Sequence, residues 1–145
     1  MIGFDYLKKT NCPITSGLIE NTIKFFSKET KFFKGEVEIV VINDKEMQKI
    51  NFCYRGKNKT TDVLSFAFQE DKNIKTDFLG QIFISYPQIK SQAKKYKVSE
   101  KEEFIRMLVH GLLHLVGYDH DTIIKEQKMF KFQESMISKI LNIKY

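Results

Sequence analysis

The chain has 145 residues, a formal net charge of +6 and only two cysteines, Cys12 and Cys53. This length fits a single domain, residues 1–145, with a core large enough to need no disulfide staple. Two cysteines do not make the framework of a secreted protein, so we expect reduced thiols and a cytoplasmic location. The N-terminal MIGFDYLKKT lacks the pattern of a signal peptide, and FIRMLVHGLLHLVGY is too short and too polar to span a bilayer. We therefore expect no membrane partner.

The basic residues are almost all lysines. Of the 24 lysine and arginine residues, only Arg55 and Arg106 are arginines. A basic balance favours polyanionic partners such as nucleic acid, because lysines near phosphates release counterions. A solvated lysine-rich surface would give the same charge, so the composition is compatible with RNA binding but does not establish it.

Four segments have the pattern of β-strands. They are IGFDYL (2–7), the β-branched run VEIVVI (37–42), DVLSFAF (62–68) and QIFISY (81–86). The charged segment QEDKNIKTD (69–77) between the last two is expected to be a loop. The strands thus predict a sheet of about four members.

Helical patterns lie between and after these strands. Residues 14–28 have apolar side chains at helical spacing, Asn43 with Glu46 fits the cap of a short helix, and Pro87 suits the first turn of a helix over 87–96. Ser99 opens a helix that runs to Val116 and is apolar almost all round from residue 107, so we expect it to be central.

A last helix follows residue 121. We expect Asp121 to cap it and five side chains to form its apolar face: Ile124, Met129, Phe132, Met136 and Ile140. Helices and strands mixed without strict alternation predict an α+β domain with a mixed sheet packed against helices.

All three histidines of the chain lie within HGLLHLVGYDH, residues 110–120. His110 and His114 are four residues apart, which places them on one helix face within reach of one zinc ion. Gly117 is expected to end the helix in a left-handed conformation and to bring His120 back toward the pair. Three histidines with a fourth position open to water are typical of a catalytic zinc. The alternative is three hydrogen-bonded core or surface histidines. The spacing on a buried helix, followed by a glycine turn, favours the metal site over it.

Gly111 separates this pattern from the H-E-x-x-H motif of metalloproteases. In that motif the residue after the first histidine is a glutamate that acts as general base. Glycine cannot accept a proton, so a protease that uses this mechanism is disfavoured.

Two blocks of the sequence resemble the YbeY family of bacterial endoribonucleases. HGLLHLVGYDH is similar to the family pattern H-G-x-L-H-L-x-G-Y-D-H, and INFCYRGKNKTTDVLSFAF (50–68) is similar to L-N-x-x-Y-R-x-x-D-x-P-T-D-V-L-S-F-P. The resemblance implies a zincin-like fold with one zinc ion held by His110, His114 and His120 at the end of the central helix. It also implies cleavage of single-stranded RNA, maturation of the 3′ end of small-subunit (16S) ribosomal RNA on the small ribosomal subunit, and ribosome quality control.

The chain departs from the family pattern at four positions. Asn58 stands where aspartate is common, Thr60 and Ala67 where proline is usual, and Gln81 where the family has aspartate in an L-G-D-I stretch. Gln81 lacks a carboxylate that would orient a ligand or accept a proton, which puts any role of that position in question.

Arg55 is the candidate for binding phosphate in the loop YRGKNK. Its planar guanidinium matches phosphate oxygens and can stabilise charge in a transition state, and the family match favours this role over a surface arginine packed on Tyr54. Lys57 and Lys59 are candidates for RNA backbone contacts. Asp119 is either a turn residue or a carboxylate that holds a ligand imidazole.

Two other functions fit the sequence. One is a zinc hydrolase acting on a different substrate, against which Gly111 argues. The other is a non-catalytic ribosome-associated RNA-binding factor with structural zinc, for which four protein ligands are expected.

Overall fold

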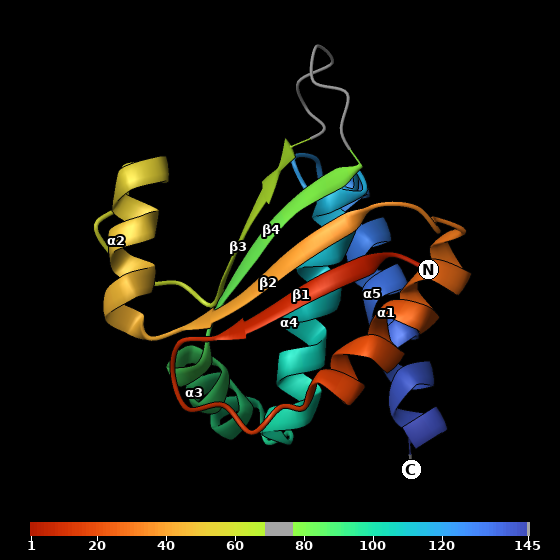
Figure 1. The fold of residues 1–145 in the computed structure, drawn as a ribbon, viewed down its shortest axis with the longest axis horizontal. Helices are drawn as coiled ribbons and strands as arrows, with labels where there is room; N and C mark the ends of the chain where they lie inside the picture. The colour runs from red at the N-terminus through yellow and green to blue at the C-terminus, as the bar shows by residue number, and fades with distance from the viewer. Residues whose placement is uncertain (69–76, 145) are drawn as a thin grey trace.

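A computed structural model describes residues 1–68 and 77–144, with side chains up to residue 142 (Figure 1). The elements follow in the order β1 (Gly3–Lys8), α1 (Ser16–Thr30), β2 (Glu36–Ile42), α2 (Asp44–Arg55), β3 (Val63–Ala67), β4 (Phe78–Ser85), α3 (Tyr86–Tyr96), α4 (Glu100–Leu115) and α5 (Ile123–Lys144). The loop expected over 69–77 lies outside the described residues except for Asp77. None of the helices in the described part of the chain has both the length and the apolar composition to cross a membrane.

The four strands form one mixed sheet in the order β1-β2-β4-β3. β1 and β4 both pair with β2 in parallel, whereas β3 pairs with β4 in antiparallel fashion and lies at the edge. The prediction of a four-stranded mixed sheet in an α+β fold is confirmed. β4 begins three residues earlier than the sequence suggested, at Phe78, and Tyr86 belongs to the helix that follows.

The helices lie on both faces of the sheet (Figure 1). α1, α4 and α5 share the larger hydrophobic core with the inward side chains of the strands. α2 covers part of the opposite face, where Met47 packs with Val40, Ile42 and Leu64. α4 lies between the sheet and α5, and its residues Phe104, Ile105, Leu108, Val109, Leu112 and Leu113 are buried. The predicted central helix is therefore confirmed.

The helix starts follow the caps expected from the sequence, with one exception. The side-chain oxygens of Asn43 and Ser99 accept hydrogen bonds from Glu46 N (2.9 Å) and Glu102 N (3.0 Å), which fixes the first turns of α2 and α4. The prediction that Asp121 caps α5 is wrong. Thr122 caps it instead, because its Oγ1 accepts from Lys125 N over 3.2 Å.

The apolar face of α5 is shorter than the sequence suggested. Met129, Met136 and Ile140 are buried, and Phe132 packs against the core. Ile124 is 68% exposed, because the first turn of α5 extends past the core instead of packing on it.

Candidate metal centre

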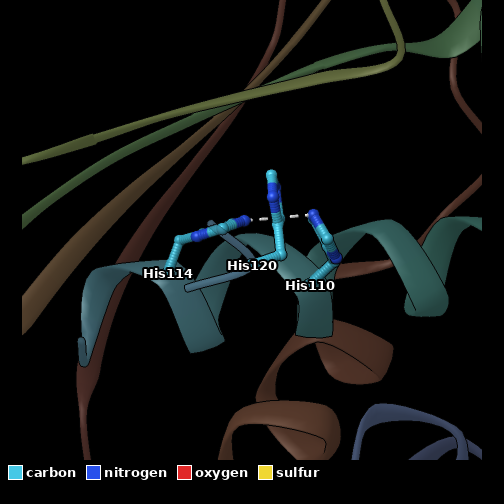
Figure 2. Close-up of side chains that lie close together, drawn as sticks. All are labelled: His110, His114 and His120. Atoms are coloured by element: carbon cyan, nitrogen blue, oxygen red, sulfur yellow. Dashed lines mark hydrogen bonds between the residues drawn. The ribbon is translucent and has the colours of Figure 1, made fainter. Parts of the chain in front are cut away.

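His110 and His114 lie in the last two turns of α4, with their ring planes 80° apart and their Nε2 atoms close together. Their Nε2 atoms are 3.2 Å apart, and the ring centroids are 4.7 Å apart (Figure 2). The spacing of four residues places both side chains on one face of the helix, as predicted.

The hydrogen bonds of the other ring nitrogens decide where the hydrogens are. His110 Nδ1 lies 2.8 Å from Gln133 Oε1, and His114 Nδ1 lies 3.0 Å from the Tyr118 carbonyl oxygen. Both partners only accept, so each Nδ1 carries the hydrogen and donates it. In the neutral rings both Nε2 atoms then carry a lone pair, and no hydrogen lies between them. Two lone pairs directed at one point can bind a cation there.

His120 reaches the pair through a turn made by Gly117. Gly117 has a φ of +103°. Its amide donates to the His114 carbonyl oxygen (3.1 Å), and the Tyr118 amide donates to the Leu113 carbonyl oxygen (2.9 Å). The Tyr118 ring stacks on Phe132 of α5 with centroids 5.7 Å apart. These contacts hold the segment that returns to the helix end.

The three imidazoles form a compact set of donors. One ring nitrogen from each histidine lies within 4.8 Å of the others, and the rings converge in Figure 2. Imidazole nitrogens suit zinc and related transition metals, so the side chains present fit such an ion. Within the described residues no cysteine or carboxylate joins the group. Cys12 is buried beside Tyr6, and Cys53 is exposed on α2. The donor set therefore matches the three-ligand sites that leave a position open.

The surroundings of His114 favour its neutral form. Burial lowers its pKa from the usual value, and the electrostatic effect of the neighbouring His110 and His120 lowers it further. A metal ligand must offer a free lone pair, so a lowered pKa keeps His114 available at neutral pH.

Arg55 shares a cleft with the three histidines. The cleft has a volume of about 610 Å³ and lies between β3 and the segment 117–121, with Arg55 and the inward side chains Val63, Ser65 and Ala67 along its walls. Arg55 is the last residue of α2, and Gly56 ends that helix with φ +70°. The preceding Tyr54 turns away and packs edge-on against Phe66, with centroids 5.3 Å apart. The structure thus brings together residues that are 55 positions apart in sequence.

The other predicted site residues lie at the margin of this cleft or outside it. Asp119 lines it, but its Oδ1 accepts the Asp121 amide over 2.7 Å, which is the contact of a turn residue. That hydrogen bond is the largest cause of the lowered pKa of Asp119. Lys57 and Lys59 are exposed in the loop after α2 and do not line the cleft.

Gln81 lies away from the histidines. It pairs with Phe66 across β3–β4 and donates through Nε2 to Glu38 Oε1 (3.0 Å). The neighbouring Ile82 points to the other face of the sheet, where a Cβ at Gly111 of α4 would touch it. Side chains alternate along a strand, so Gln81 lies on the face of the sheet opposite the metal centre. The replacement of the family's aspartate by glutamine therefore alters that opposite face.

Sequence reasoning missed the polar residues of α5 that support His110. Gln133 contacts His110, and it lies beside Glu134, which binds Arg106 of α4. They line a second groove, of about 910 Å³, that also reaches His110 and His120. Gln133 is 23 residues from His110, so no local spacing could indicate the contact.

The fold and the site define a class: an α+β protein with a four-stranded mixed sheet and a three-histidine cluster at the end of its central helix that fits a metal ion. The family model described as Endoribonuclease YbeY matches residues 7–141. The chain belongs to this endoribonuclease family, and the resemblance noted in the sequence is confirmed.

Individual relatives agree with this assignment. Endoribonuclease YbeY of Leptospira interrogans is 41% identical over 132 residues, covering 80% of this chain and 94% of the relative. The protein of the same name from Sulfurihydrogenibium sp. is 37% identical, and the match covers 88% of this chain and 84% of that protein. The one from Bacillus licheniformis is 38% identical, and the match covers 83% of this chain and 82% of that protein. The solution structure of TM1509 from Thermotoga maritima superposes with a TM-score of 0.68 at 24% identity, covering 98% of this chain and 90% of that one, and supports the fold alone.

Proposed function

We propose that this chain is a single-domain, zinc-dependent endoribonuclease that cuts single-stranded RNA in the cytoplasm. The observation that carries this proposal is the shared cleft, which Arg55 lines together with the three histidines. Family membership supplies the class of reaction, and the net charge of +6 suits a polyanionic substrate.

In this proposal, His110, His114 and His120 hold one zinc ion through Nε2 of the first two and a ring nitrogen of the third. Bound zinc supplies a Lewis acid at the scissile phosphate. Gln133 and the Tyr118 carbonyl keep the first two rings in the tautomer that offers Nε2. Asp119 supports the turn that carries His120.

Arg55 binds and orients the phosphodiester. Its side chain is exposed in the cleft, and its fork of donors matches the non-bridging oxygens of a phosphate. The guanidinium also stabilises the additional negative charge of the transition state. Lys57 and Lys59 add positive charge next to Arg55 and contact the neighbouring phosphates of the bound RNA strand.

The biological substrate proposed here is the 3′ end of small-subunit ribosomal RNA, with a further role in ribosome quality control on the small subunit. The family resemblance supports this step. An unpaired strand suits the site because a flexible backbone can bend to bring one phosphate between Arg55 and the histidines.

The test compares cleavage of a single-stranded RNA and its duplex by the zinc-loaded chain. We expect cleavage of the single strand, and loss of cleavage with full zinc content in Arg55→Ala. We expect loss of both zinc and cleavage in His114→Ala. Lys90→Ala removes an exposed charge of α3 outside the cleft and serves as the control.

Each alternative outcome is informative. Full activity in Arg55→Ala would contradict the role of the guanidinium. RNA binding without cleavage in the zinc-loaded chain would identify a non-catalytic factor, and cleavage of peptides in place of RNA would identify a different hydrolase.

A further inference from the structure

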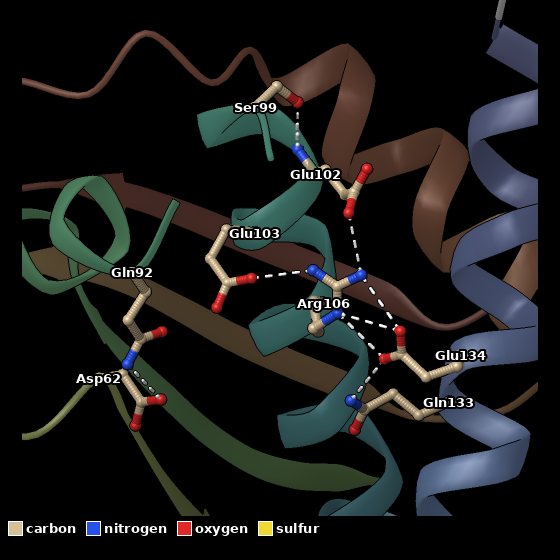
Figure 3. Close-up of polar contacts among 8 residues, drawn as sticks. All are labelled: Asp62, Gln92, Ser99, Glu102, Glu103, Arg106, Gln133 and Glu134. Atoms are coloured by element: carbon tan, nitrogen blue, oxygen red, sulfur yellow. Dashed lines mark hydrogen bonds and ion pairs between the residues drawn. The ribbon is translucent and has the colours of Figure 1, made fainter. Parts of the chain in front are cut away.

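The amide of Gln133 has a fixed orientation toward His110. Its Nε2 donates to Glu134 Oε2 over 3.2 Å (Figure 3). This leaves Oε1 to accept the hydrogen of His110 Nδ1 over 2.8 Å. A carboxylate accepts only, so the amide cannot turn around without placing two acceptors against each other. Gln133 itself is buried, with 4% of its surface exposed.

Arg106 holds Glu134 in place. Its Nε donates to Glu134 Oε2 (3.0 Å) and its Nη2 to Glu134 Oε1 (3.1 Å). The remaining donors bind Glu103 Oε1 (2.8 Å) and Glu102 Oε2 (3.0 Å) on the same helix (Figure 3). The rigid guanidinium fork therefore fixes the carboxylate at a set position on α5.

These contacts form one continuous series from Arg106 through Glu134 and Gln133 to His110. The series crosses twice between α4 and α5, once from Arg106 to Glu134 and once from Gln133 to His110. Its last contact acts on the ring whose other nitrogen faces His114. The series explains why one of two neutral tautomers of His110 is favoured.

We propose that Gln133 is the positioning residue of the metal centre, oriented by Glu134 and Arg106. Its carbonyl oxygen keeps the hydrogen of His110 on Nδ1, so that the Nε2 lone pair is directed at the metal position before any ion binds. The inference deepens the proposed function, because it concerns the same site. It depends on the zinc site and not on the RNA substrate.

A purely structural role, in which Gln133 only joins α5 to α4, makes different predictions. Such a role would change the stability of the fold without changing the tautomer of His110. A positioning role changes the tautomer and the zinc affinity together. Partners of this kind contribute about 10–100-fold to the affinity of a site for its metal.

The first experiment measures zinc affinity by competition with a chelator and thermal unfolding of the zinc-free chain. We expect Gln133→Leu to lower zinc affinity about 10–100-fold. Gln133→Glu alone would place two carboxylates against each other, so the rescue variant combines it with Glu134→Gln, which keeps an acceptor for the His110 hydrogen and a donor–acceptor pair between the two side chains. We expect this double variant to restore most of the affinity. Gln127→Leu, at an exposed position of α5 that lines the same groove, is the matched control and should leave zinc affinity unchanged.

The second experiment reads the tautomer directly. Nitrogen-15 NMR of the zinc-free chain, well above the usual imidazole pKa of about 6.5, should show His110 protonated on Nδ1. In Gln133→Leu we expect a mixture of both tautomers. An unchanged tautomer in that variant would overturn the proposal, as would unchanged zinc affinity. If the wild-type chain binds no zinc, the proposed metal site fails, and this spectrum still tests Gln133.

A third experiment tests whether Glu134 acts on the metal centre through Gln133. If Glu134 acts on the site only through Gln133, Glu134→Leu lowers zinc affinity in the wild-type chain and has no further effect in a chain that carries Gln133→Leu. Additive losses in the double variant would show that Glu134 acts independently and would contradict this part of the inference.

Discussion

Gly111 of α4 lies directly against Ser65 of β3. The Ser65 hydroxyl donates to the Gly111 carbonyl oxygen over 3.4 Å, and a Cβ at position 111 would lie 3.1 Å from that hydroxyl and 3.0 Å from Ile82 Cγ2. The missing side chain therefore allows the metal-bearing helix to pack close to the sheet. The residue that separates this family from H-E-x-x-H proteases also has a packing role.

We expect Gly111→Glu to destabilise the fold without creating peptidase activity. The added side chain has no space between α4 and the sheet, which costs about 1–3 kcal/mol from overpacking, and an unpaired buried charge adds to this. Urea unfolding of the zinc-free chain would measure the loss. A variant as stable as the wild type would show that the helix can move away from the sheet at little cost.

The backbone conformation at Gly117 should affect zinc binding, because this residue makes the turn that carries His120. Its φ of +103° is unfavourable for any side chain, and nothing lies within 4 Å of a Cβ there, so Gly117→Ala tests the backbone alone. We expect a loss of about 1–3 kcal/mol and weaker zinc binding, because the turn delivers His120. Gly56→Ala also adds a Cβ in open space, at φ +70°, and serves as the control. Chelator competition should show normal zinc affinity for Gly56→Ala. Equal zinc affinities in the two variants would contradict the role of this turn.

Asp44 should make stability depend on pH. Burial raises its pKa, but hydrogen bonds to Oδ1 from Gln88 (3.0 Å), Ser85 (2.8 Å) and Thr60 (2.9 Å) lower it more, and the net shift is downward. The ionised carboxylate thus stabilises the fold above the unfolded pKa of about 3.9, and this contribution is lost as the pH falls through the folded-state pKa.

The comparison with Asp44→Asn isolates this effect. We expect the wild type to be more stable than the variant near neutral pH, and the difference to shrink as the pH falls below about 3.9. Urea unfolding at several pH values measures it. A difference that stays constant over this range would mean that the charge of Asp44 contributes nothing.

The sequence by itself determined the local elements and the histidine set. Periodicity and caps placed α4 and its buried side chains, because backbone hydrogen bonds and side-chain caps act within a few residues. A spacing of four residues and the glycine after the helix predicted that His110, His114 and His120 converge, since helix geometry and a left-handed turn suffice for that. The start of α5 was misassigned, because Asp121 and Thr122 are both capable caps.

The tertiary structure alone decided which distant residues meet this set. Arg55 enters the histidine cleft because β3 lies at the sheet edge beside α4, and strand order is a long-range property. The sequence left the role of position 81 open, and the alternation of β4 places Gln81 on the other face of the sheet. Gln133, Glu134 and Arg106 meet only when α5 packs on α4. Helix packing brings together side chains with no fixed separation in sequence, so the support of the metal centre is visible only in the folded chain.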